Sequence, residues 1–565
     1  MGEGVRLGDA SLLGTLPVRL QDELLAAAQP VRLLAQERLF CEGDAADRLF
    51  FVVSGRLRVI VEREGERRVV RLLGPGAAIG ELAVLTGALR SASVEAVRDS
   101  ELLEIESERF LDLLAHDQDL SVGLATALAR QLQQSGHLWE PDMPPTVFTI
   151  APVPGVDGRA FWDELCAAFA ELGPTVAVEH REGNGWGRDL AELEAGHAHV
   201  LLLARPDGGE WADFCLRQAD RVLFVATGAP PEDLDAPEGC DVAFLGTPGA
   251  QAVADWRAAA RPRAHHVVPV DDGIAAQRVA RRLAGRSLGI VLSGGGARAF
   301  AHLGVLEVLA AEGLAIDRVG GTSMGAFVSA MVALGWTPER MLDICRTEVA
   351  QKAPFSDYTL PRYALIRARR AESMLRRLFG DVSVEELPRP LFTVSADLLS
   401  GQMVVNRDGP LVEAVGASMA IPGLAPPIPH RAQLLIDGGV LNNLPIDLMV
   451  ADEPGPVVAV DVMRRITLGE LKSSARASLP TILETLSRAT VLGSVERAET
   501  NRSLARIVIM PQVQDIALRN FRGLDRAVDA GRRAAEEALA AGAKDELLAT
   551  RAPPPAVFSA VHATH

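Results

Sequence analysis

A serine between two glycines is the first candidate for chemistry in this sequence. Ser323 lies in the segment Gly-Thr-Ser-Met-Gly at 321–325, directly after a short apolar run. Between a strand and a helix, the pattern G-x-S-x-G predicts a nucleophile elbow, a sharp turn that holds the serine hydroxyl clear of the sheet. We therefore expect Ser323 to attack a carbonyl carbon. The alternative is a serine that only caps the following helix.

A run of three glycines upstream offers hydrogen-bond donors for the oxyanion that forms when a serine attacks a carbonyl. Gly294, Gly295 and Gly296 follow the apolar run 288–292 and precede Arg298. Glycines at the start of a helix leave backbone N–H groups free to point at a developing oxyanion, and Arg298 adds a fixed positive charge nearby. Two glycine-rich turns of this kind, one carrying a serine, predict an acyl-transfer site more strongly than G-x-S-x-G alone.

The base that activates the serine is predicted to be an aspartate. Between residues 288 and 561 the only histidines are His302 and His430, and a Ser–Asp–His triad would need a histidine downstream of the acid. Asp437 ends an apolar run at a glycine turn. Because sites in open α/β sheets gather at the carboxyl ends of strands, we expect Asp437 and Ser323 to meet there as a dyad. A simple Asp-Gly turn is the alternative for Asp437.

These three motifs together resemble the patatin-like phospholipases, over roughly residues 286 to 465. The resemblance implies a Ser–Asp dyad, with Ser323 the nucleophile and Asp437 its base. It also implies that the glycine loop with Arg298 forms the oxyanion site, and that catalysis uses no metal or other cofactor. The sequence departs from the family at Ala299, where a glycine is usual.

A second set of residues suggests a regulatory ligand. Gly80 and Glu81 open a short apolar segment, and Arg90 and Ser91 follow it. This stretch resembles the phosphate-binding cassette of cyclic-nucleotide-binding domains. N–H groups at a helix start and Arg90 suit a cyclic phosphate, Glu81 suits a ribose 2′-hydroxyl, and Ser91 adds a hydroxyl contact. The ligand would be cAMP or cGMP, and a barrel that keeps the fold but binds nothing is the alternative.

The net charge, the cysteines and the lengths of the apolar runs indicate the compartment and the kinds of partner to expect. The 565-residue chain carries a net charge of −17, which argues against nonspecific binding of nucleic acid. Its five cysteines are scattered without metal-ligand spacing and indicate a cytoplasmic protein. No signal peptide or membrane-spanning run is found, so we expect contact with the inner membrane face to be peripheral.

The elements that position these residues fall into several domains. We expect a β-barrel followed by helices at 1–137, with strands at Leu49–Val53 and Leu57–Val61 on either side of Gly55. An α/β spacer without a phosphate loop is expected at 146–283, and an α/β patatin-like domain with C-terminal helices at 286–550. Residues 551–565 read as a disordered tail.

This domain order resembles the bacterial relatives of neuropathy target esterase. The resemblance implies hydrolysis of phospholipids or lysophospholipids, and the leading hypothesis is a serine esterase with a regulatory nucleotide sensor. The other hypothesis is a nucleotide-responsive scaffold whose inactive hydrolase fold binds lipid or partners.

An arginine-rich stretch at 362–377 also allows two interpretations. Six arginines alternate there with apolar residues. They are either a solvated helix face paired with acidic neighbours or a lid that meets lipid phosphates at a membrane surface.

Overall fold

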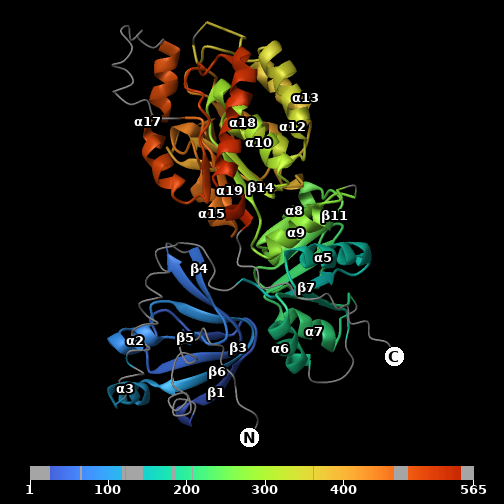
Figure 1. The fold of residues 1–565 in the computed structure, drawn as a ribbon, viewed down its shortest axis with the longest axis vertical. Coiled ribbons are helices and arrows are strands. Elements are labelled where there is room, and N and C mark those ends of the chain that lie inside the picture. Colours follow the sequence, from blue (N-terminus) through green and yellow to red (C-terminus); the bar gives the residue numbers. More distant parts are fainter. Residues whose placement is uncertain are drawn as a thin grey trace.

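The computed structural model describes residues 26–63, 66–116, 121, 144–180, 186–206, 208–270, 272–360, 362–463 and 482–548. Within them the chain forms three sheets in sequence order, as Figure 1 shows: a barrel, an α/β unit and a larger α/β unit at the opposite end of the molecule. The predicted multidomain fold class is confirmed. The predicted tail at 551–565 lies outside the described residues.

In the residues that the structure describes, the barrel is an antiparallel sheet accompanied by short helices. Its strands are β1 (Gln29–Leu33), β2 (Arg38–Phe40), β3 (Arg48–Arg63), β4 (Glu66–Leu73), β5 (Ala78–Ile79) and β6 (Ser93–Glu106), and its helices are α2 (Glu81–Thr86) and α3 (Ser107–His116). The strand order is β1-β6-β3-β4, with β2 beside β6 and β5 beside β3.

The two strands predicted on either side of Gly55 are one continuous strand. Gly55 has φ +94°, and a Cβ there would lie 2.2 Å from Ser100 Oγ. The glycine therefore bends β3 and shifts its register against β6 without ending the pairing. The prediction of a turn was wrong because a glycine inside a strand pattern marks a bulge as readily as a turn.

The spacer is a six-stranded parallel sheet between two helical layers. Its strands, in the order β12-β11-β10-β7-β9-β8, are β7 (Val147–Pro152), β8 (Thr175–Val178), β9 (His199–Leu203), β10 (Arg221–Ala226), β11 (Asp241–Leu245) and β12 (Ala264–Val268). Helices α5 (Arg159–Leu172) and α9 (Ala275–Leu283) cover one face. Helices α6 (Trp186–Gly196), α7 (Glu210–Gln218) and α8 (Ala250–Ala260) cover the other. Strands buried on both faces explain the nearly continuous apolar runs in this sequence.

The third unit is an eight-stranded mixed sheet. Its strands are β13 (Gly289–Leu292), β14 (Arg318–Thr322), β15 (Leu391–Asp397), β16 (Met403–Asn406), β17 (Ile428–His430), β18 (Gln433–Asp437), β19 (Val457–Val460) and β20 (Ile507–Ile509). The path is β17-β18-β15-β14-β13-β19-β20, with β16 beside β15. Strands β13, β14, β15, β19 and β20 are parallel, whereas β16, β17 and β18 are antiparallel additions at one edge.

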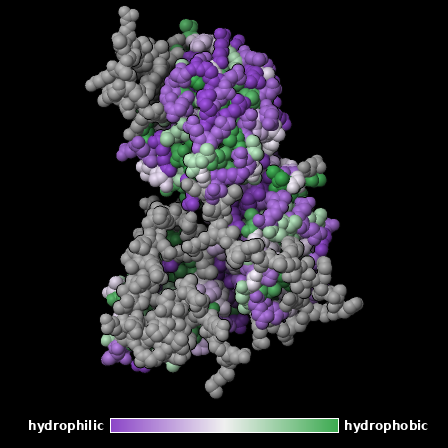
Figure 2. All heavy atoms as spheres, viewed as in Figure 1, coloured by the Kyte–Doolittle hydropathy of each residue, from purple (hydrophilic) through white to green (hydrophobic). Residues whose placement is uncertain are grey.

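Helices cover both faces of this sheet. One layer contains α10 (Ala301–Ala311), α11 (Met324–Ala333), α12 (Pro338–Ile344), α13 (Arg369–Phe379), α14 (Leu411–Ser418) and α18 (Leu524–Ala540) around the main apolar core. The other contains α15 (Ile446–Asp452) and α17 (Ile482–Arg502). The face of this unit seen in Figure 2 is mostly hydrophilic. None of the described helices has the length and apolar character needed to cross a bilayer.

Buried ion pairs join the three units. Asp220 of the spacer lies 3.2 Å from Arg56 Nε and 3.4 Å from Arg98 Nε of the barrel. Burial acts to raise the pKa of Asp220, but the two arginines outweigh it and the pKa lies below its ordinary value. On the other side, Arg282 of α9 pairs at 2.9 Å with Glu453, which follows α15. Because removing one partner of a buried pair is costly, these contacts fix how the units meet.

Candidate active site

Ser323 occupies a strained turn between β14 and α11. Its φ of 56° and ψ of −129° are unusual for a residue with a side chain. Gly325 allows the turn, since a Cβ there would lie 2.2 Å from the carbonyl oxygen of Leu292 on the neighbouring strand β13. This is the geometry that the G-x-S-x-G pattern predicts, with the serine hydroxyl raised at the start of the helix.

A second serine, which the sequence analysis did not single out, supports the turn. The backbone N–H of Ser323 donates to Ser418 Oγ at 2.9 Å, and that hydroxyl donates to the carbonyl oxygen of Val394 at 2.6 Å. Ser418 ends helix α14 and is fully buried. It therefore ties the elbow to β15, and no local pattern around it signals this role.

The strand that carries Asp437 to the serine is arranged differently from our expectation. Its strand, β18, runs antiparallel to β15, so Asp437 and Ser323 do not lie at matching ends of parallel strands. Asp437 pairs instead with Ser395, one residue beyond the pair formed by Val394 and Thr322. Asp437 therefore lies at nearly the same position along the sheet as Ser323, with strand β15 between β14 and β18.

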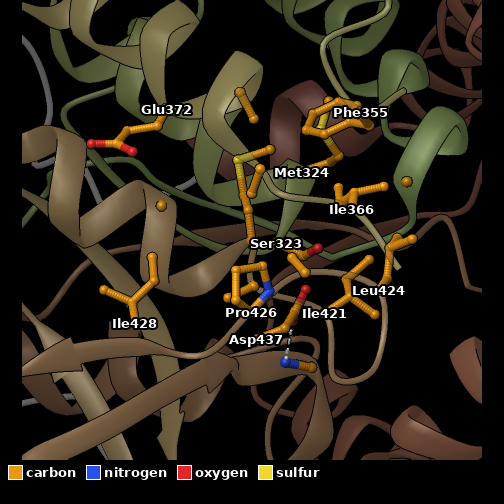
Figure 3. Close-up of a pocket in the computed structure, with 18 of the residues that line it drawn as sticks. Ser323, Met324, Phe355, Ile366, Glu372, Ile421, Leu424, Pro426, Ile428 and Asp437 are labelled. Atoms are coloured by element: carbon orange, nitrogen blue, oxygen red, sulfur yellow. Dashed lines mark hydrogen bonds between the residues drawn. The ribbon is translucent and has the colours of Figure 1, made fainter. Parts of the chain in front are cut away.

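The two side chains point toward one another in the pocket (Figure 3). Burial raises the pKa of Asp437 to about 6, while hydrogen bonds from the Ser323 hydroxyl and from the Gly439 N–H act to lower it. The Gly439 bond is 2.8 Å long and holds the carboxylate in place. A carboxylate with a pKa close to neutrality is a far better general base than an ordinary aspartate.

Neither candidate histidine lies at this site. His302 is fully buried, its Nε2 lies 2.9 Å from the carbonyl oxygen of Ser293, and burial lowers its pKa to about 4. The imidazole of His430 lies 3.3 Å from a carboxylate oxygen of Glu413. No histidine among the described residues lines the pocket around Ser323. The geometry therefore favours the dyad over a triad.

The glycine loop divides into one structural residue and two that face the pocket. The N–H of Gly294 donates to the carbonyl oxygen of Asn443 at 3.3 Å. Gly295 and Gly296 line the pocket, and their N–H groups donate to no acceptor in the part of the chain that the structure describes. Met324 also lines it, and the N–H of the residue after the nucleophile is a common oxyanion donor. Gly295, Gly296 and Met324 are therefore the best placed donors.

Arg298 does not line the pocket. Its guanidinium donates to the carbonyl oxygens of Ile516 at 2.7 Å and Gln514 at 3.1 Å, and the side chain is buried. We expected its charge beside the oxyanion, but the structure uses the side chain to fasten the glycine loop to the segment after β20. Arg298 therefore positions the glycine loop and does not contact the oxyanion itself.

The dyad opens into a cavity of about 440 Å³. Most of its lining is apolar, as Figure 3 shows for Met324, Phe355, Ile366, Ile421, Leu424, Pro426 and Ile428. The charged residues that line it are Arg367, Glu372, Arg376, Glu413 and Arg519, besides Asp437. The volume lies within the range of roughly 300–1,000 Å³ that small-molecule sites occupy.

The predicted nucleotide-binding residues gather at α2 of the barrel. Gly80 precedes the helix with φ 85°, and Arg90 Nη1 donates to its carbonyl oxygen at 3.2 Å. Glu81 and Arg90 are both buried, whereas Ser91 is exposed. Burial lowers the pKa of Arg90 against the opposing charges of Asp47, Glu81 and Asp44. The structure thus brings Gly80, Glu81 and Arg90 together and leaves Ser91 at the surface.

Comparison with known proteins places relatives along most of the chain. Residues 290–450 match the family of patatin-like phospholipases, and residues 30–117 match the cyclic nucleotide-binding domain. An uncharacterized NTE family protein of Mycobacterium tuberculosis is 35% identical over 95% of this chain and 96% of its own length. Patatin-like phospholipase domain-containing protein 6 of Mus musculus is 29% identical over 76% of this chain, which spans 37% of that relative.

Proposed function

The chain belongs to the neuropathy target esterase (NTE) family of patatin-like phospholipases, and we propose that Ser323 and Asp437 are the dyad with which it hydrolyses acyl esters of phospholipids or lysophospholipids. The observation that carries the assignment is the pairing of an elbow serine with a buried carboxylate of pKa about 6. An apolar cavity at the serine suits a fatty acyl chain.

The first half-reaction transfers the acyl group to the enzyme. Ser323 Oγ attacks the ester carbonyl carbon while Asp437 takes the hydroxyl proton. The N–H groups of Gly295, Gly296 and Met324 donate to the oxyanion of the tetrahedral intermediate. When this intermediate collapses, the bond to the alcohol oxygen breaks, and protonated Asp437 gives its proton to the departing alkoxide. An acyl-serine remains.

Water completes the reaction. Asp437, again ionised, takes a proton from a water molecule whose oxygen attacks the acyl-serine carbonyl. The second tetrahedral intermediate expels Ser323 Oγ, which regains the proton from Asp437, and the fatty acid leaves. Each proton that Asp437 accepts is returned within the same half-reaction, so the cycle uses one water for each ester bond and no other reagent.

A fluorophosphonate probe tests the assignment on the intact chain. We expect one covalent adduct, mapped by mass spectrometry to Ser323, together with release of fatty acid from a panel of phospholipids and lysophospholipids. The Ser323→Ala variant should lose both the adduct and the release. An unlabelled protein that still binds lipid would instead support the scaffold hypothesis.

For the barrel we propose that cAMP or cGMP binds at α2, with the phosphate on Arg90 and the ribose on Glu81. Three observations support this site: the match to the cyclic nucleotide-binding domain, the buried Glu81 and Arg90, and the Arg90 Nε, which is buried without a hydrogen-bond partner among the described residues. A phosphate would supply the anionic partner that this guanidinium lacks. Calorimetric titration of the full chain with each nucleotide tests the site, and the absence of heat with both would reject it.

A further inference from the structure

A hairpin-like segment lies at the mouth of the catalytic cavity. The segment comprises residues 357–360 and 362–367, and we refer to it as the mouth hairpin. The N–H of Arg367 donates to the carbonyl oxygen of Asp357 at 3.0 Å, and the N–H of Ile366 donates to that of Leu424, a lining residue, at 2.9 Å. Arg367 and Ile366 themselves line the cavity. The base of the mouth hairpin is therefore built into the entrance of the site.

Large apolar and aromatic side chains project from this hairpin into solvent. Leu360 is 89% exposed, Tyr363 is 75% exposed and Tyr358 is 60% exposed. Single exposed apolar residues are common on soluble proteins, but three within six positions at the edge of an apolar cavity form a local cluster. Tyrosine is also a residue that prefers the boundary between lipid and water.

Arginines surround the cluster, and they fall into two groups. On α13, Arg376 pairs with Glu372 at 3.0 Å and Arg377 pairs with Glu348 at 2.7 Å, as the interpretation of a solvated helix face expects.

The arginines nearest the hairpin behave differently. Arg362, Arg367 and Arg369 are exposed, and across the described chain no carboxylate lies within 4.0 Å of their guanidinium groups. In a chain of net charge −17, such a group of uncompensated cations is unusual and is available to an anionic partner.

We propose that the mouth hairpin docks the enzyme on the surface of an anionic phospholipid bilayer. Leu360 and Tyr363 enter the boundary between head groups and acyl chains, and Arg362 and Arg369 contact lipid phosphates. The cavity entrance then faces the bilayer, so an acyl chain reaches Ser323 without crossing bulk water. The proposal rests on the proposed function, because docking would bring a lipid substrate to the active site. Binding to the bilayer itself requires no catalysis.

Sedimentation with vesicles tests the proposal on the full chain carrying Ser323→Ala, which prevents hydrolysis. We expect binding to vesicles of phosphatidylcholine mixed with phosphatidylglycerol, and much weaker binding to phosphatidylcholine alone. Because each arginine near an anionic surface contributes about a fivefold factor, Arg362→Gln with Arg369→Gln should weaken binding roughly 25-fold. Leu360→Asp with Tyr363→Asp should also weaken it.

Two changes on the spacer serve as matched controls. Val270→Asp removes an apolar side chain that is 91% exposed, and Arg205→Gln removes an exposed arginine. Neither should alter vesicle binding. Parent protein that does not bind the anionic vesicles, or hairpin variants that bind as the controls do, would overturn the proposal; the first result would direct attention to an acidic protein partner.

A soluble short-chain ester separates this proposal from the proposed function. With Ser323 intact, the hairpin variants should hydrolyse a dissolved ester at the parent rate while losing activity on vesicles. Loss of vesicle activity alone supports docking, whereas equal loss on both substrates contradicts it. A parent enzyme inactive on every ester would reject the esterase assignment and leave the vesicle-binding result to stand by itself.

Discussion

Asn443 and Gly294 are joined by two hydrogen bonds, although they lie far apart in the sequence. The Gly294 N–H donates to the Asn443 carbonyl oxygen at 3.3 Å, and the Asn443 side-chain amide donates to the Gly294 carbonyl oxygen at 3.2 Å. Gly294 begins the glycine loop, and Asn443 follows the turn that carries Asp437. The pair therefore fixes the oxyanion donors relative to the base.

Replacing Asn443 should disturb catalysis more than substrate binding. In Asn443→Ala the side-chain bond is lost and the glycine loop is held less firmly. We expect kcat to fall about tenfold or more with little change in KM, because small misplacements of reacting groups are costly. Steady-state kinetics on a soluble ester measures this, with exposed Asn520→Ala as the control. A change in KM alone would make Asn443 a binding residue.

A side chain at Gly295 should impair the oxyanion donors. A Cβ at this position would lie 2.4 Å from Val462 Cγ2, so the loop must shift. In Gly295→Ala we expect kcat to fall by roughly 10²-fold, the scale for loss of one oxyanion donor. Gly249→Ala is the control, since nothing lies within 4 Å of a Cβ there. If Gly295→Ala changed only KM, the loop would bind substrate rather than stabilise the transition state.

The pKa of Asp437 predicts the acidic limb of the pH profile. The ionised carboxylate is the active form, and burial raises its pKa to about 6. Activity should therefore be full well above that pH and should fall about tenfold per unit as the pH drops below it. The profile of kcat/KM on a neutral soluble ester measures the limb. A limb near the ordinary aspartate pKa of about 4 would contradict the assignment of a desolvated base.

The nucleotide site makes a separate prediction. Arg90→Gln removes the positive charge next to Gly80 and should weaken the binding of cAMP or cGMP roughly 10- to 100-fold, the scale of a hydrogen bond to a charged group. Arg109→Gln on α3 is the control, because its guanidinium is exposed and pairs with Asp112. Calorimetry on the full chain gives both affinities, and equal affinities would place the ligand elsewhere.

Coupling to catalysis has its own test. A nucleotide changes the hydrolysis rate only if it favours one arrangement of the units over another. The buried contacts of Arg56 and Arg98 with Asp220 are among several ion-pair contacts between barrel and spacer. If the nucleotide alters the rate, Asp220→Asn should reduce that response while leaving nucleotide affinity unchanged. If the nucleotide changes the hydrolysis rate of Asp220→Asn as it does that of the parent, this contact does not couple the barrel to catalysis.

The local features of the site could be predicted from the sequence. The elbow at Ser323, the glycine loop and the acid turn each need glycines at set positions between apolar runs, and short-range patterns carry that information. Contacts between distant segments could not be predicted. Ser418 and Asn443 act on residues far away in the chain, and nothing beside them in the sequence signals it.

Two expectations failed for the same physical reason. The charge of Arg298 does not line the pocket because the carbonyl oxygens of the 514–516 segment bind its guanidinium. Asp437 and Ser323 also do not meet at the carboxyl ends of parallel strands, because β18 pairs antiparallel with β15 and an apolar run does not fix the direction in which its strand pairs. Both depend on tertiary neighbours that a local pattern does not contain.

Hydrolysis by the single and double dyad variants is the most direct test of the central claim. We predict that Ser323→Ala and Asp437→Asn each abolish ester hydrolysis in a folded protein, and that the double variant is little worse than either single variant, because the two residues act as a unit. Substantial activity in Asp437→Asn, or losses that multiply in the double variant, would contradict the dyad.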